Sequence, residues 1–198
     1  MPVVLDVSPA PLPEPVVCSI MAALKYELPV NVLLAVAGQE AGKPGQWVRN
    51  SNGTYDVGPM QFNTGYLREL ARYGITPGDV EKGGCYSYEL AAWRIRGHVR
   101  NDSGDLWTRV ANYHSRTPPI NARYRRQIMH RSADWADWLE ARFATQPINL
   151  QSIAAIADRK ADEVKPQARA LSRPAHSYAS PSGQNSYVPR QLWASGQP

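Results

Sequence analysis

Cysteine is scarce in this sequence of 198 residues, which contains only Cys18 and Cys85. Neither residue belongs to a Cys-x-x-Cys pair, so the sequence predicts no zinc or other metal site, and no other pattern predicts a cofactor. A disulfide between two cysteines so far apart would stabilise the fold by about 4 kcal/mol in the chain-entropy treatment. The residues alone leave two alternatives equally open, a disulfide and a pair of buried free thiols.

Long apolar runs are also absent. No stretch approaches the roughly 18 consecutive apolar residues that a membrane-spanning helix needs, so we expect no membrane span. Residues 1–15 are rich in proline and are expected to form an extended leader. They lack the basic segment and the uninterrupted apolar core of a secretory signal peptide, and no such signal is recognised there.

The balance of charge is modest. Charged residues make up 20% of the sequence, and the formal net charge is +5. This excess indicates good solubility, or attraction to an acidic polymer such as carboxylate-bearing peptidoglycan or a nucleic acid. A basic cluster that could lie beside either polymer comprises Arg123, Arg125, Arg126, His130 and Arg131. Because no zinc-finger or helix-turn-helix signature is present, we expect no nucleic-acid partner.

Apolar residues recur at helical spacing along most of residues 16–145, which predicts a mainly α core domain. The expected helices cover about 16–28, 30–41, 60–73, 86–99, 106–114 and 121–143. Between the second and third, Asn52-Gly53 favours a small β-hairpin or hairpin-like loop within residues 47–57. Residues 146–198 are expected to hold a short amphipathic helix at 148–164 and then a disordered tail rich in Pro, Ser, Gln and Ala.

Glu40 is the first candidate for chemistry. It follows Leu33 and Val36 at helical spacing, so its carboxyl group projects from an otherwise apolar face. It also lies in the last turn of the expected helix, where the unpaired carbonyls disfavour a negative charge. Both effects raise its pKa and would allow it to donate a proton near neutral pH. The alternative is a solvent-exposed glutamate at a helix end, without a catalytic task.

A second unusual run extends from Asn52 to Gln61. Gly58 would allow the backbone to approach a neighbour or ligand closely, and Pro59 suits the first turn of a helix. The Met60-Gln61 pair would open that helix. The Gln61 amide offers both a donor and an acceptor, which suit an acetamido group or a sugar hydroxyl.

Three segments together resemble the motifs of the soluble lytic transglycosylase family, in the expected order. The similarity runs through about residues 16–130 and is strongest to the branch that accompanies conjugation, type IV secretion, pili and type III secretion. The segments are Glu40-Ala41-Gly42, the run Asn52-Gly53-Thr54-Tyr55-Asp56-Val57-Gly58-Pro59-Met60-Gln61, and Ala111-Asn112-Tyr113-His114-Ser115. The resemblance implies a goose-lysozyme-like α fold with a glycan cleft between helical lobes.

The resemblance also implies roles for individual residues. Glu40 matches the sole catalytic carboxylate, and Tyr113 matches the motif tyrosine that helps to hold the sugar and that glutamate. The remaining expected substrate-binding positions are Gly58, Met60, Gln61 and Tyr124. In this branch a cysteine of the first helix often pairs with one before a later helix, which implies a disulfide between Cys18 and Cys85.

The sequence departs from the family pattern at three positions. Ala41 stands where many relatives have Ser, and the family pattern then implies the loss of a hydrogen bond that supports the catalytic glutamate. Pro59 replaces a commoner aliphatic residue, and His114 stands where a broader motif has Asn.

The family activity implied is cleavage of the β-1,4 bond between N-acetylmuramic acid and N-acetylglucosamine, which leaves 1,6-anhydromuramic ends. We therefore expect a monomeric enzyme of the periplasm or cell envelope. Its partners would be peptidoglycan glycan strands and the proteins of a secretion or conjugation apparatus.

Three other readings remain open. A hydrolytic, lysozyme-like muramidase would use Asp56 as a second carboxylate, although a turn-capping role for Asp56 is preferred. A non-catalytic wall-binding assembly component would not need the acid. A nucleic-acid-binding module would show salt-sensitive affinity for DNA.

Overall fold

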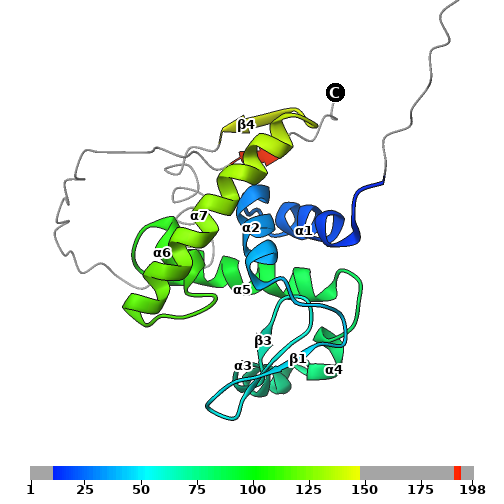
Figure 1. Ribbon diagram of the computed structural model, residues 1–198, viewed down its shortest axis with the longest axis vertical. Helices are drawn as coiled ribbons and strands as arrows, with labels where there is room; N and C mark the ends of the chain where they lie inside the picture. Colours follow the sequence, from blue (N-terminus) through cyan, green and yellow to red (C-terminus); the bar gives the residue numbers. More distant parts are fainter. Residues whose placement is uncertain (1–10, 148–189, 193–198) are drawn as a thin grey trace, which may run out of the picture.

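The computed structural model describes residues 11–147 and 190–192, and its architecture is mainly helical, as predicted. Figure 1 shows α2 at the centre, flanked by α1 and α7, with the small sheet and α3 below them. The elements are α1 (Glu14–Lys25), α2 (Val30–Glu40), β1 (Trp47–Arg49), β2 (Tyr55–Val57), β3 (Phe62–Asn63), α3 (Thr64–Leu70), the 3₁₀ helix η1 (Ala71–Tyr73), α4 (Pro77–Val80), α5 (Tyr86–Asn101), α6 (Leu106–Ala111), α7 (Pro118–Glu140), β4 (Thr145–Pro147) and β5 (Arg190–Leu192).

Helix α2 forms the centre of the core. Every residue from Val30 to Val36 is buried, so this helix is covered on all sides rather than on one apolar stripe. Its one polar buried residue, Asn31, donates from Nδ2 to the backbone oxygen and to Oγ of Ser132 in α7, at 3.2 and 3.0 Å. A buried amide with partners costs little, so this contact fixes how α2 and α7 pack against each other. The last turn of α2 then leaves the core and reaches the sheet.

The three-stranded sheet confirms the hairpin predicted at Asn52-Gly53 and adds a strand. β1 and β2 pair antiparallel, with Val48 opposite Asp56, and β3 continues the sheet on the other side of β2. Gly53 adopts φ +81°, which suits glycine at the hairpin end. The sheet therefore forms a small lobe directly after the end of α2.

The helix expected over residues 60–73 is wrong in its first part. Residues 58–61 form a turn, β3 follows, and α3 begins only at Thr64. Helix α3 begins there because the Oδ1 atom of Asn63 accepts a hydrogen bond from the backbone nitrogen of Gly65, at 2.8 Å. Three further elements were not predicted: α4 and the strands β4 and β5, which pair with each other. The expectation of a tail without regular structure does not hold for residues 190–192.

The remaining boundaries of the predicted helices differ by a few residues. Helix α1 begins at Glu14, two residues before the expected start, and α7 begins at Pro118, where proline suits the first helical turn. The helix expected over residues 148–164 and most of the proline-rich leader lie outside the described residues. None of the described helices is long and apolar enough to cross a membrane.

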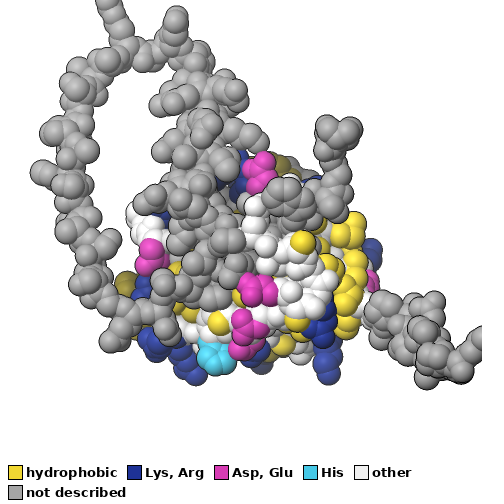
Figure 2. Space-filling model, turned by 90° about the horizontal axis from the view of Figure 1, so that it is seen from above, with side chains coloured by type: hydrophobic (Ala, Val, Ile, Leu, Met, Phe, Trp, Pro, Cys, Tyr) yellow, Lys and Arg dark blue, Asp and Glu magenta, His cyan; other side chains and the backbone are white. Residues whose placement is uncertain are grey.

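The surface of the described part carries charges of both signs. In the face shown in Figure 2, Lys and Arg side chains lie mainly toward the lower edge, and Asp and Glu side chains lie nearer the centre. Charges of both signs are therefore present on this face.

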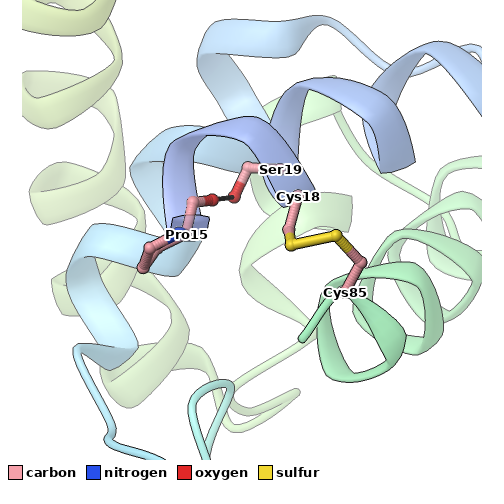
Figure 3. The surroundings of a disulfide bond; sticks show 4 residues. All are labelled: Pro15, Cys18, Ser19 and Cys85. Atoms are coloured by element: carbon pink, nitrogen blue, oxygen red, sulfur yellow. Dashed lines mark hydrogen bonds between the residues drawn. A yellow bond between two sulfur atoms is a disulfide. The ribbon is translucent and has the colours of Figure 1, made fainter. Parts of the chain in front are cut away.

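A disulfide joins Cys18 in α1 to Cys85, which lies immediately before α5 (Figure 3). Beside it, Ser19 Oγ donates to the backbone oxygen of Pro15 at 2.7 Å. The bond closes a loop of 67 positions that contains α2, the sheet and α3. It confirms the pairing that the family resemblance implied, and it is compatible with a protein outside the reducing cytosol.

We predict that reducing this disulfide lowers the free energy of unfolding by about 2–5 kcal/mol, because the unfolded chain regains the entropy of a long open loop. Urea denaturation with and without dithiothreitol measures this loss. The matched control is the double variant Cys18→Ser, Cys85→Ser, which should have the stability of the reduced protein and should not respond to reductant. Equal midpoints for oxidised and reduced wild type would contradict the prediction.

Candidate active site

Glu40 is the last residue of α2 and lies where the buried helix meets the sheet lobe. The helix ends because Ala41 takes the left-handed conformation, with φ 48°. Ala41, and not the following Gly42, supplies this conformation, although glycine is the residue that usually does so at a helix end. Gly42 is needed for a different reason. A Cβ atom at this position would lie 2.2 Å from the backbone oxygen of Gly58, and the Gly42 nitrogen donates to Pro59 O at 3.1 Å.

The turn at residues 58–61 forms the surface against which the end of α2 rests. Gly58 has φ +71°, and a Cβ atom there would lie 2.1 Å from the backbone oxygen of Val80. Gln61 also has a positive φ, 49°, although it is not glycine. Its backbone nitrogen and its side-chain Nε2 both donate to Gly58 O, at 3.1 and 2.8 Å. Gly58 and Gln61 therefore hold the shape of the turn.

Tyr124 of α7 makes the direct contact with the candidate acid. Its hydroxyl group donates to Glu40 Oε1 at 2.5 Å, and its side chain is only 4% exposed. The His114 ring stacks on the Tyr124 ring, with centroids 4.7 Å apart and an angle of 5° between the planes. The Tyr124 ring is thus held between its own helix, α7, and the segment after α6. This contact fixes the direction of the hydroxyl group.

Tyr113 and Met60 form a second, fully buried contact below the site. The Tyr113 hydroxyl donates to the backbone oxygen of Met60 at 2.7 Å. The Met60 side chain is completely buried, and Tyr113 is 3% exposed. Both side chains are therefore buried, and in this structure they support the turn at residues 58–61. Their predicted contact with a sugar stays a prediction.

Arg94 of α5 places a positive charge beside this group. Its guanidinium lies over the rings of Tyr66 and Tyr113, 3.9 and 4.7 Å from the two centroids. Stacking on aromatic rings attracts a guanidinium cation and holds it in place. The positive charge of Arg94 lowers the pKa of Glu40, so the arginine is close enough to act on the candidate acid.

The surroundings of Glu40 raise its pKa from 4.5 to about 7. Burial is the largest cause, because the ionised carboxylate loses hydration at the end of the buried helix. The hydrogen bond from Tyr124 lowers the pKa, the negative charge of Asp56 raises it, and Arg94 lowers it. Both the protonated and the ionised forms of this group are therefore populated near neutral pH. The elevated pKa predicted from the apolar helix face is confirmed.

Asp56 lies in β2 and does not cap a turn, contrary to the preferred expectation. Its Oδ1 atom accepts a hydrogen bond from Asn63 Nδ2 at 2.8 Å. The same Nδ2 atom donates to Thr54 Oγ1 at 2.9 Å, while Asn63 Oδ1 caps α3. Asp56 thus belongs to a polar contact that ties the hairpin to α3, and it also acts electrostatically on Glu40.

The structure brings the predicted residues together near Glu40, but several of them have roles that differ from the predicted ones. Tyr124, not Tyr113, makes the hydrogen bond to Glu40, and Gly58, Met60 and Gln61 shape the turn. Sequence reasoning missed Arg94, which belongs to no motif, and it noted His114 only as a departure from the family pattern. Among the described residues, His, Cys, Asp and Glu form no group of three that could hold a metal ion.

Comparisons with known proteins identify distant relatives. The chain is 29% identical over 116 residues to the invasion protein IagB of Salmonella typhimurium, strains SL1344 and LT2, and of Salmonella typhi. The aligned part covers 56% of this chain and 72% of the relative. No protein-family model matches the chain. The chain is thus distantly related to proteins named for invasion.

We predict that Tyr124→Phe raises the pKa of Glu40 above its value of about 7, because it removes a hydrogen bond that stabilises the carboxylate. A hydrogen bond to a charged group contributes roughly 1.5–3 kcal/mol, so the midpoint should rise by about 1–2 pH units. Carbon NMR of the labelled side-chain carboxyl group measures this, with Glu40→Gln identifying the signal.

The matched control is Tyr113→Phe, which removes a hydroxyl group bonded to Met60 O rather than to Glu40. Its titration midpoint should stay near 7. A Tyr124→Phe midpoint at or below that of the wild type would show that the hydroxyl group does not stabilise the carboxylate.

Proposed function

We propose that this protein is a peptidoglycan lytic transglycosylase in which Glu40 is the only catalytic carboxyl group. The observation that carries the proposal is the geometry of Glu40. It is an acid at the end of a buried helix, hydrogen-bonded to a clamped tyrosine, with a pKa of about 7. A general acid works best when its pKa lies near the working pH. The motif resemblance to soluble lytic transglycosylases supports the same reaction.

The proposed reaction needs one group that gives up a proton and later takes one back. Because the Tyr124 hydroxyl donates to Oε1, the acidic proton of Glu40 is carried on Oε2. That proton passes to the oxygen linking N-acetylmuramic acid to N-acetylglucosamine as the C1–O bond breaks, and the substrate's own N-acetyl group stabilises the developing cation. The carboxylate then accepts the proton of the C6 hydroxyl group as its oxygen bonds to C1. The acid is regenerated, and no water is consumed.

Tyr124 suits both halves of this cycle. Its hydroxyl group stabilises the ionised carboxylate between the two steps, and burial favours the protonated form before the first step. These opposing effects keep the two forms close in free energy. Acid and base assistance of this kind contributes roughly 10²–10⁴ in rate.

The setting of the reaction is proposed from three features. The relatives are named invasion proteins, the motifs resemble the branch that accompanies secretion systems, conjugation and pili, and a disulfide suits a compartment outside the cytosol. We infer that a monomer acts in the periplasm or cell envelope. It would open the wall locally for a secretion, conjugation or pilus apparatus.

A hydrolytic muramidase is the second candidate, favoured by the electrostatic effect of Asp56 on Glu40. Two-carboxylate glycosidases place their groups about 5 Å apart for retention or about 6.5–9.5 Å apart for inversion. Under this alternative Asp56 would activate water or attack C1. Its hydrogen bond from Asn63 gives it a structural role instead, which supports the single-acid reaction.

We predict that Glu40→Gln lowers the cleavage of purified sacculi by at least about 10²-fold, because amide nitrogen cannot donate a proton to the leaving oxygen. The matched variant is Asp56→Asn, which keeps the shape beside Asn63 and should retain most of the turnover. Mass spectrometry of the wild-type products should find 1,6-anhydromuramic ends. Reducing ends, together with an inactive Asp56→Asn, would establish the muramidase.

We also predict that kcat/KM for sacculi falls as the pH rises through about 7, because the reaction begins with protonated Glu40. The same group should make the stability of the fold fall as the pH rises from about 4.5 to 7, because the native state still holds a proton that the unfolded chain has lost. Above pH 7 the buried carboxylate should lower the free energy of unfolding by up to about 3 kcal/mol relative to low pH. Initial rates and urea midpoints across pH 4–9 check both effects. Glu40→Gln should remove this part of the pH dependence of stability.

A further inference from the structure

A cavity of about 820 Å³ lies between α3 with its 3₁₀ extension and α5, beside the candidate active site. It begins at Asn63, which contacts Asp56, and at Tyr66, over which Arg94 stacks. From there it continues along α5 as far as Arg100 and Asn101. Its size falls within the range of about 300–1,000 Å³ that is typical of binding pockets for small ligands. Arg94, which lines the cavity, also acts electrostatically on Glu40, so the cavity lies near the candidate acid.

Positive charge exceeds negative charge around this cavity. Its charged lining is Arg72, Arg94, Arg96, Arg100 and Arg116 against Glu69 and Asp102. Asp102 is already engaged: it accepts from Arg116 Nη2 at 3.0 and 3.1 Å, and from Asn112 Nδ2 at 2.8 Å.

Some of the arginines are engaged as well. Arg96 bonds to Glu27 and to the backbone oxygen of Tyr26. Within residues 11–147, neither Arg72, Arg94 nor Arg100 forms an ion pair. Glu69 is the one acid of the lining that is left to face them, and Arg94 also acts on Glu40 outside the cavity. The excess is unbalanced by the protein itself, which favours an anionic ligand.

We propose that this cavity binds the carboxylates of the peptide stem on the glycan strand that Glu40 cleaves, an inference that rests on the proposed function. Arginine forks bind carboxylates through paired hydrogen bonds, which suits the unpaired arginines here. The exposed ring of Trp93 and the ring of Tyr66 add apolar surface for peptide side chains. The glycan at the acid and its peptide in the cavity would then be held together, and the enzyme would prefer strands that keep their stems.

The test compares two substrates made from the same sacculi: strands with their peptides, and strands stripped of peptides by an amidase. The informative variant is Arg72→Gln, Arg100→Gln, since both side chains are exposed and neither contacts Glu40. We expect its KM for peptide-bearing strands to rise about three- to tenfold, the range for losing two exposed charge contacts. Its kcat and KM on stripped strands should equal those of the wild type. The rise should shrink at high salt.

The matched control is Arg123→Gln, Arg126→Gln, which removes the same charge from a separate hollow of about 680 Å³ beside Gln39. It should retain the wild-type preference for peptide-bearing strands. The inference is overturned if the cavity variant keeps that preference, if both double variants lose it equally, or if the cavity variant also fails on stripped strands. In each case wild-type turnover leaves the proposed function standing. If the wild type cleaves neither substrate, the proposed function fails and this inference fails with it.

Discussion

The hydrogen bond from Tyr124 to Glu40 is the contact on which the chemistry of this fold depends. It crosses from α7 to the end of α2 and holds one carboxylate oxygen at 2.5 Å. Burial alone would keep the carboxyl group protonated too firmly to act again as a base, and an exposed carboxylate would have no proton to give. Set against each other, the two effects place the pKa at about 7. The stacked His114 ring matters because it fixes the hydroxyl group that makes this balance possible.

The small sheet lobe positions Glu40 through close contacts between backbone segments rather than through functional side chains. Gly42 and Gly58 allow three backbone segments to meet, at the end of α2, at the turn and at the end of α4. Gln61 bonds to Gly58 and so closes the turn. Residues that resemble substrate-binding motifs thus contribute to geometry, and Arg94 joins the acid to the arginine-lined cavity.

Sequence reasoning reached the elements that depend on local pattern. The buried helix that carries Glu40, the hairpin at Asn52-Gly53 and the elevated pKa all follow from neighbouring residues. The partner of Glu40 does not, because Tyr124 lies 84 positions away and helical periodicity carries no information on such contacts. The turn before α3 was missed because a positive φ at Gln61 comes from tertiary packing against Gly42, whereas the local residues favour a helix start. The disulfide was reached only through the family resemblance.

Helix α2 is the centre of the core and also carries Glu40. Burial is continuous from Val30 to Val36, and Glu40 follows one turn later. The packing of α2 and the proton affinity of Glu40 therefore depend on the same apolar residues. A substitution that loosens the core at Leu33 or Val36 admits water toward the carboxyl group and makes it a stronger acid, even though it touches no ligand. Over evolution, drift in these apolar positions is limited by the pH at which the protein must work, as well as by the need to fold.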